Sequence, residues 1–258
     1  MADLDDIEAV ARVTVMAGGA ELSRRYREGD IDGEYGANDV KAVADEAAEA
    51  RMLPVVRRAF PDHTVFTEES GEFAGDGPYR WIIDPLDGTN NYAVGLPTFA
   101  TSVAVLQDGS PVLAVVHQPA TDETYLARRG AGVRYEGERV TAGSVIDIEA
   151  ATVTTIVGRD VPRDPALGRQ VDTIREALGG TVKRVIDSRA PTVHSGLFAR
   201  GRLQGLVQFH PDEEEQAVTE LLAMEADAAT HREGPLYVAA RDEETLATLR
   251  DVVTDVRG

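Results

Sequence analysis

The sequence of 258 residues contains no cysteine, and its lysines are Lys41 and Lys183. The absence of cysteine excludes disulfides and thiolate ligands to a metal. No apolar stretch is long enough to span a bilayer. The first residues, Met1–Asp6, are acidic and lack the basic and apolar regions of a signal peptide. These absences lead us to expect a cytoplasmic protein.

Positive charge is also scarce. The sequence has 45 Asp and Glu against 26 Lys and Arg, which gives a formal net charge of −19. Such a field disfavours nucleic acid and anionic membranes as partners. Acidity, few lysines and many small apolar residues together suggest adaptation to high salt, as in a haloarchaeon that keeps molar salt in its cytoplasm. The alternative is an acidic protein of ordinary salt tolerance.

The first part of the chain mixes helices with strands. Leu4, Ile7, Val10 and Leu22 follow a helical repeat over residues 4–28. Residues 39–59 predict a second helix, in which Pro54 should cause a kink or a break. Strands are then expected over the following ranges: 63–67, 81–84, 98–106, 111–117 and 123–127, the last three as an antiparallel meander.

After about residue 148, strands alternate with helices, a pattern that indicates an α/β unit. The expected strands are residues 151–157, 181–186, 203–209 and 236–240. The expected helices are residues 165–178, 192–200, 213–226 and 242–253. We therefore predict two domains: an α+β half over residues 1–148 and an α/β half with a mixed sheet over residues 149–258.

The run from Trp81 to Tyr92 joins a buried strand to a rigid acidic turn. Its apolar start ends in Asp84 and Asp87, and Pro85 restricts the backbone between them. Such a turn can aim both carboxylates and the Leu86 carbonyl at one point. Three converging oxygens suit a hard cation such as Mg²⁺. The alternative for the two aspartates alone is an ordinary Asp-rich turn, but the whole run favours a metal site.

The residues after this turn favour an anion. Gly88 has no side chain, so that a ligand can approach its backbone closely. If Thr89, Asn90 and Asn91 open a helix, their N–H groups face that ligand. A metal beside an anion indicates phosphate chemistry.

Further carboxylates precede this run. Asp45, Glu68 and Glu69 lie near the expected ends of secondary-structure elements. Clustered carboxylates repel one another, and cations relieve that repulsion. Taken singly, Asp45 is better explained as a solvated helix residue, and Glu68 and Glu69 as a charged strand end.

These motifs together resemble the inositol monophosphatase family of metal-dependent phosphatases. The resemblance rests on Phe66–Ser70 and Trp81–Tyr92, supported by Asp39–Asp45, Gly95–Pro97 and Arg129–Gly132. It extends over nearly the whole chain. It implies a layered αβαβα sandwich, with an antiparallel sheet in the first half and a mixed α/β unit in the second, which would contribute substrate recognition and a further metal carboxylate.

The resemblance also implies a ligand set for two or three Mg²⁺ ions, with Mn²⁺ as a possible substitute. Glu68, Asp84 and the Leu86 carbonyl would hold one ion. Asp84 and Asp87 would hold a second, together with Glu215 from the second half. Glu68 would also help to bind a weaker third ion.

The resemblance assigns further residues to catalysis and to the substrate. Asp45 and Thr89 would orient the attacking water, with Glu68 as a catalytic metal ligand. Gly88, Thr89 and Asn90 would contact the phosphate. Gln208 stands where the family has a glutamate that touches sugar hydroxyls.

The second half departs from the family pattern. Glu214-Glu215 replaces a Trp-Asp pair whose aspartate binds metal, and Asp212, Glu213 and Glu214 could substitute for it. An acidic, solvated helix start is the alternative. Arg189 lies in another altered segment and could bind a second phosphate or a carboxylate, or simply be a surface arginine.

Together these features predict Mg²⁺-dependent hydrolysis of a small polyol or sugar phosphate by a phosphoric monoester hydrolase. One alternative is fructose-1,6-bisphosphatase activity. Another is a catalytically weak homologue that binds metal and a phosphorylated ligand, because Glu214-Glu215 replaces Trp-Asp. By resemblance alone, we expect a homodimer. The expected partner is a small-molecule phosphate ester.

Overall fold

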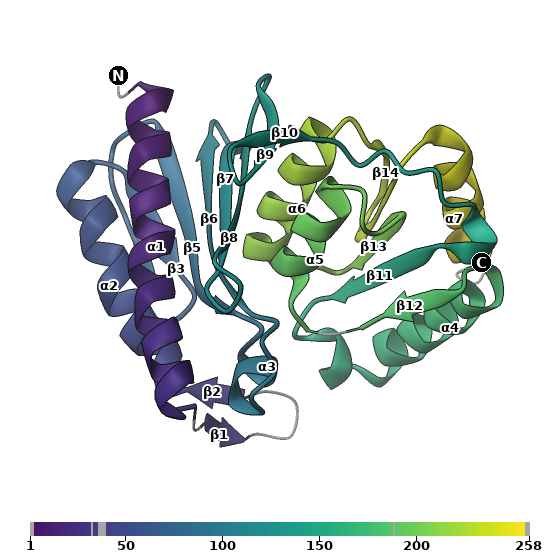
Figure 1. The fold of residues 1–258 in the computed structure, drawn as a ribbon, viewed down its shortest axis with the longest axis horizontal. Helices are drawn as coiled ribbons and strands as arrows, with labels where there is room; N and C mark the ends of the chain where they lie inside the picture. The colour runs from purple at the N-terminus through teal and green to yellow at the C-terminus, as the bar shows by residue number, and fades with distance from the viewer. Residues whose placement is uncertain (1–2, 32, 36–39, 188, 256–258) are drawn as a thin grey trace.

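A computed structural model describes residues 3–31, 33–35, 40–187 and 189–255. Its layers are visible in Figure 1: a helical pair, a large sheet, a second helical pair, a smaller sheet and a third helical pair. This arrangement confirms the layered α/β sandwich predicted from the sequence. Within the described residues, no helix is both long enough and apolar enough to cross a membrane.

The larger sheet has eight strands in the order β10-β9-β8-β7-β6-β5-β3-β4. Its pairs are antiparallel, except that β3 runs parallel to β5. In chain order its strands are β3 (Thr64–Thr67), β4 (Gly71–Phe73), β5 (Tyr79–Asp87), β6 (Ala100–Gln107), β7 (Ser110–Gln118), β8 (Glu123–Arg128), β9 (Gly132–Tyr135) and β10 (Glu138–Val140).

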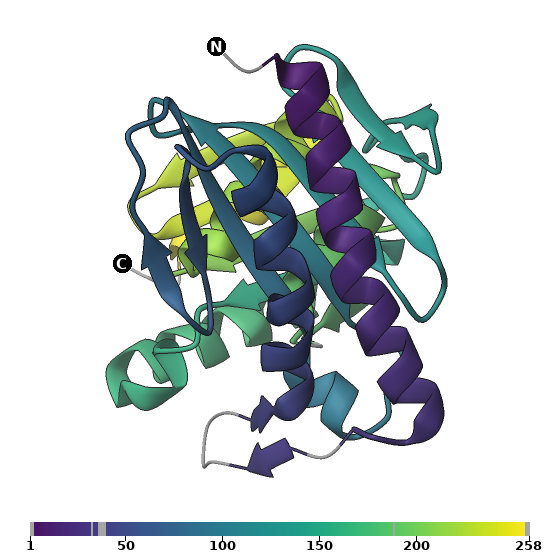
Figure 2. The same cartoon turned by 90° about the vertical axis from the view of Figure 1, so that its left-hand side faces the viewer.

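Helices α1 (Leu4–Glu28) and α2 (Val43–Ala59) lie side by side on one face of this sheet (Figure 2). Their apolar stripes pack on the sheet through buried residues such as Ile7, Val15 and Met52. Helix α2 continues through Pro54 without the predicted break, because buried residues on both sides of the proline pack against the rest of the protein. It begins at Val43, since β2 (Val40–Ala42) pairs with β1 (Gly33–Tyr35) where the helix was expected.

The smaller sheet has five strands in the order β12-β11-β13-β15-β14. Strand β11 is parallel to β12 and β13, whereas the β13–β15 and β15–β14 pairs are antiparallel, as expected for a mixed sheet. Its strands are β11 (Thr152–Val157), β12 (Arg184–Ile186), β13 (Gly205–Phe209), β14 (Ala229–Glu233) and β15 (Leu236–Ala240).

Two helical pairs enclose the smaller sheet. Helices α5 (Pro191–Ala199) and α6 (Glu213–Glu225) lie between the sheets and share one apolar core with both of them. Helices α4 (Pro165–Thr181) and α7 (Glu243–Asp255) cover the outer face through a separate core. Short 3-10 turns precede β11 (η1, Ile148–Ala150) and α4 (η2, Val161–Arg163).

The described chain passes from the larger sheet to the smaller one once, along residues 141–151 (Figure 1). The predicted division into domains at residues 148 and 149 falls in this connection and stays a prediction. Several element ends meet where the two sheets face each other: the ends of β3, β5 and β11, and the beginnings of α5 and α6. The candidate site lies there.

Candidate functional site

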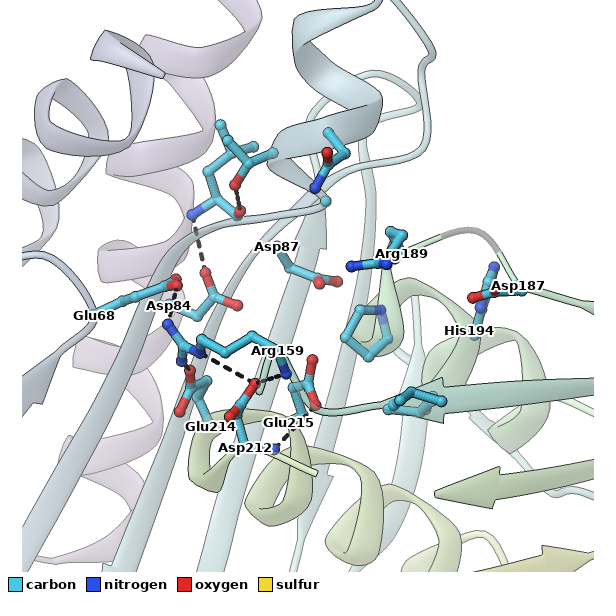
Figure 3. Close-up of a pocket in the computed structure, with 18 of the residues that line it drawn as sticks. Glu68, Asp84, Asp87, Arg159, Asp187, Arg189, His194, Asp212, Glu214 and Glu215 are labelled. Atoms are coloured by element: carbon cyan, nitrogen blue, oxygen red, sulfur yellow. Dashed lines mark hydrogen bonds and ion pairs between the residues drawn. The ribbon is translucent and has the colours of Figure 1, made fainter. Parts of the chain in front are cut away.

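A polar pocket opens between the two sheets (Figure 3). Both sheets and the starts of α5 and α6 contribute to its wall. The ionisable side chains that line it are Glu68, Asp84, Asp87, Arg159, Asp187, Arg189, His194, Asp212, Glu214 and Glu215. Leu86, Gly88, Thr89 and Asn90 line it as well. The pocket therefore gathers most of the site residues expected from the sequence.

Strand β5 places two carboxylates, those of Asp84 and Asp87, in the pocket lining. Its pairing with β6 is irregular between these two residues. Both aspartates are 4% exposed. The Leu86 N–H donates to Asp84 Oδ1 at 3.1 Å, which fixes the turn between them. Burial, and then the negative charge of Glu68, raises the pKa of Asp84 well above its usual value. A nearby cation would favour its ionised form.

Asp87 is held by the smaller sheet's side of the pocket. Its Oδ2 accepts hydrogen bonds from the backbone N–H of Thr192 at 2.9 Å and of Val193 at 3.4 Å, and from the Thr192 hydroxyl. Burial raises the pKa of Asp87 to about 7, although the donors from Thr192 and Val193 oppose that shift. Asp87 therefore ties the β5 turn to the first turn of α5.

Gly88 makes the bend from β5 into helix α3 (Thr89–Ala93). Its φ of 89° lies in the left-handed region. A Cβ at this position would lie 2.9 Å from the Thr98 carbonyl oxygen. Glycine is required on both counts. The helix predicted to open at Thr89 is present and brings Thr89 and Asn90 to the pocket.

Asp45 lies behind the pocket rather than in its lining. It belongs to the first turn of α2 and is 3% exposed. The Thr89 hydroxyl is 3.5 Å from Asp45 Oδ1 and donates a shorter bond of 3.0 Å to the Leu86 carbonyl. The structure thus brings Asp45 and Thr89 together, with Thr89 turned mainly toward Leu86.

The start of α6 carries three consecutive glutamates that point to different partners. Glu213 pairs with Arg80 at 2.6 Å, outside the pocket. Glu214 pairs with Arg159. Glu215 Oε2 accepts from the Asp212 N–H at 3.1 Å as part of a capping box.

Glu215 nevertheless lies within the electrostatic reach of the β5 turn. Burial, followed by the negative charges of Asp212 and Asp87, raises the pKa of Glu215 well above its usual value. Glu215 lines the pocket as the sequence led us to expect. One of its two oxygens is engaged in the helix cap.

Gln208 lies outside the pocket lining. It is fully buried in β13, and its Nε2 is 3.5 Å from the Glu215 carbonyl oxygen. Among the described residues, its Oε1 has no hydrogen-bond partner. The structure therefore places Gln208 next to the start of α6 and outside the pocket lining.

Arg159 is the main pocket residue that the sequence analysis missed. It follows β11 and projects into the acidic wall, where its guanidinium pairs with Glu68 at 2.7 Å, with Asp212 at 3.1 Å and with Glu214. These carboxylates raise the pKa of Arg159, against the lowering effect of burial. The available signal was its position just after the strand predicted over residues 151–157.

The oxygen atoms that line the pocket are of the chemical kind that binds a hard divalent cation. The pocket offers carboxylate and carbonyl oxygens, the ligands that Mg²⁺ prefers. Buried carboxylates with raised pKa values gain stability from a cation, and Arg159 already supplies one positive charge to the cluster. As they stand, the described side chains bring no three His, Asp or Glu residues close enough together to hold an ion. Small side-chain movements would have to accompany binding.

The comparisons agree with this picture. The chain matches the model of the Inositol monophosphatase family over residues 3–214. It is 41% identical over 123 residues to the Nus factor SuhB of Escherichia coli strain K12. The matched segment covers 47% of this chain and 46% of that protein. It is 36% identical over 143 residues to the fructose-1,6-bisphosphatase/inositol-1-monophosphatase of Aquifex aeolicus. The matched segment covers 54% of this chain and 54% of that protein. The chain thus spans about half the length of the curated relatives it matches.

Solved structures show the same fold. The inositol monophosphatase from Anabaena sp. PCC 7120 superposes with a TM-score of 0.82 at 24% identity, over 98% of this chain and 97% of that one. The extragenic suppressor protein suhB of Bartonella henselae superposes with a TM-score of 0.85 at 24% identity, over 95% and 98% of the two chains.

Proposed function

This chain belongs to the inositol monophosphatase family, and we propose that it hydrolyses the phosphate monoester of a small polyol or sugar phosphate with Mg²⁺ as its cofactor. The observation that carries the proposal is the pocket in which the Asp84–Asp87 turn, Glu68 and the start of α6 face one another. This arrangement joins buried oxygen donors to a tight glycine turn, which suits a metal and a phosphate side by side.

The proposed metal ligands are those that the family resemblance implies, and all of them line the pocket. Glu68, Asp84 and the Leu86 carbonyl would hold one ion. Asp84 and Asp87 would hold a second with Glu215, and Glu68 would also serve a weaker third site. Bound Mg²⁺, for which Mn²⁺ could substitute, lowers the pKa of a bound water and stabilises negative charge on the departing oxygen.

The chain's own residues would bind and orient the substrate and the water. Gly88, Thr89 and Asn90 lie where a phosphate can approach the backbone closely. Asp45 can accept the Thr89 hydroxyl proton in a hydrogen bond, which leaves the Thr89 oxygen free to accept one from a water. In this proposal the pair orients the attacking water, and Gln208 acts only through the position of α6.

The test is hydrolysis by the purified chain with Mg²⁺ in molar KCl. Inositol 1-phosphate and fructose 1,6-bisphosphate are the substrates, and released phosphate is the readout. We expect turnover that Asp87→Asn abolishes, because the amide removes a charge that the proposed second ion needs. Asp122→Asn is the matched control, since Asp122 is an exposed turn residue with a φ of 57° that asparagine tolerates.

Two results would contradict the proposal. One is no hydrolysis of either substrate. The other is an Asp87→Asn variant as active as the wild type. Binding of Mg²⁺ and a phosphorylated ligand without turnover would instead support the catalytically weak homologue.

Fructose-1,6-bisphosphatase activity is a second candidate, favoured by Arg189. Its exposed side chain lines the pocket on the side away from Glu68 (Figure 3). A guanidinium there can bind a second phosphate of the substrate. A ratio of kcat/KM values that favours the bisphosphate, and that falls in Arg189→Gln, would establish this activity over that of a monophosphatase.

We also propose that the protein is a cytoplasmic homodimer of haloarchaeal origin, without nucleic-acid partners. The support is its composition and its family membership. Size-exclusion chromatography with light scattering in molar KCl tests the dimer. A gel-shift titration with RNA tests the exclusion of nucleic acid, and saturable binding at physiological salt would overturn it.

A further inference from the structure

Arg159 joins three carboxylates that come from two places in the fold. Its guanidinium pairs with Glu68, which follows β3 of the larger sheet, with Asp212, the N-cap of α6, and with Glu214 in the first turn of that helix. Figure 3 shows the guanidinium between Glu68 and Glu214, directly below Asp84. One cation therefore serves both walls of the pocket.

In the metal-free protein, this position of Arg159 neutralises a buried carboxylate. The Glu214 side chain is 7% exposed, and an ionised carboxylate so deeply buried is destabilising unless a cation pairs with it. Arg159 also donates its backbone N–H to Asp212 at 3.0 Å, so that its side chain begins from a fixed point. The planar guanidinium can reach several oxygens at once, which a lysine ammonium cannot do as well.

The same contacts conflict with the proposed metal site. Glu68 is a proposed metal ligand, yet its Oε1 already accepts a hydrogen bond from Arg159 at 2.7 Å. A divalent ion between Glu68 and Asp84 would lie close to the guanidinium, and like charges repel strongly at such distances. A divalent ion and the Arg159 guanidinium therefore compete for the Glu68 carboxylate.

We propose that Arg159 is a resident counter-cation that holds the acidic pocket together in the metal-free protein and competes with the divalent ion for Glu68. Metal entry then requires the guanidinium to withdraw from Glu68, while Glu214 and Asp212 can keep it nearby. Arg159 thus sets the metal concentration at which the site fills. This inference rests on the metal dependence proposed above.

Arg80 supplies a matched control. It connects the larger sheet to the start of α6, because it leaves β5 and pairs with Glu213 at 2.6 Å and with Glu72 at 3.1 Å. It does not line the pocket. Removing either arginine changes the net charge equally and breaks a bridge to the start of α6, but removing Arg80 leaves Glu68 untouched.

The experiment compares the wild type with Arg159→Gln, Arg159→Lys and Arg80→Gln. Isothermal titration with Mn²⁺ at fixed ionic strength gives the metal affinity, and calorimetric melting gives the stability with and without Mn²⁺. We expect Arg159→Gln to bind Mn²⁺ about tenfold more tightly, which corresponds to about 1.4 kcal/mol. It should melt at a lower temperature without metal, and saturating Mn²⁺ should remove most of that difference.

The other variants complete the test. Arg159→Lys should lie between the wild type and Arg159→Gln in both measurements, and Arg80→Gln should keep the wild-type affinity. If Arg159→Gln folds only when Mn²⁺ is present, the counter-cation function is supported. Unchanged or weaker Mn²⁺ binding by Arg159→Gln overturns the inference, as does an equal gain in Arg80→Gln. Phosphate release by the wild type is measured in parallel, because its loss would count against the proposed function and not against this competition.

Discussion

Replacing Thr192 with valine probes the connection between the β5 turn and α5. The threonine side chain is fully buried, and its hydroxyl and N–H both donate to Asp87 Oδ2. Valine keeps the shape but removes the hydroxyl donor. The backbone N–H groups of residues 192 and 193 remain.

The expected loss follows from the charge and burial of the acceptor. A hydrogen bond to a charged group contributes about 1.5–3 kcal/mol, and water has little access to replace this one because Asp87 is 4% exposed. The loss should be largest above the Asp87 pKa of about 7, where the carboxylate is ionised. Without the donor the pKa of Asp87 rises further, so that Mn²⁺ binding at pH 8 should weaken by about tenfold.

The assay is calorimetric melting and Mn²⁺ titration at pH 8, with Thr101→Val as the control. The Thr101 hydroxyl is equally buried but donates to the Val15 carbonyl of α1 at 2.9 Å, and Thr101 does not line the pocket. Its removal should cost about 0.5–1.5 kcal/mol and leave the metal affinity unchanged. The reasoning is refuted if Thr192→Val binds Mn²⁺ like the wild type, or if both variants lose affinity equally.

Two further predictions concern pH and salt. Burial lowers the pKa of His194 to about 4 in the folded protein, from an ordinary value of 6.5. The folded state thus favours the neutral ring. This preference adds about 3 kcal/mol to the free energy of unfolding above pH 6.5, and that contribution is lost as the pH falls toward 4. Melting temperatures should therefore decline less steeply over that range in His194→Gln, and parallel curves would contradict this account. With a net charge of −19, the protein should melt at a higher temperature in molar KCl than in dilute buffer, because salt screens repulsion among carboxylates; a higher melting temperature in dilute buffer would remove the case for halophilic adaptation.

The β5 turn was predictable because its determinants are local. Asp84-Pro85 and Asp87-Gly88 restrict the backbone within a few residues, and Gly88 adopts the left-handed conformation that such a turn needs. Strand and helix periods located most of the remaining elements. Strand β14 was missed because its side chains are mostly polar, and its position is determined by pairing with β15.

The partners of the site were not predictable because they depend on tertiary packing. Thr192 reaches Asp87 across 105 residues of sequence, and Arg159 reaches Glu68 across 91. The three glutamates of α6 show the same limit. Successive helix positions differ by about 100°, so that the sequence alone could not tell which of them faces the pocket.

The single passage of the described chain between the two sheets, along residues 141–151, bears on how the gene could be divided. Two coexpressed fragments broken within that connection would each retain an uninterrupted set of strands. Alone, each would expose apolar surface from the core that α5 and α6 share with both sheets, and would be prone to aggregate. Their reassembly would restore that core and the pocket together, so that the proposed phosphatase activity could report whether the fragments have associated.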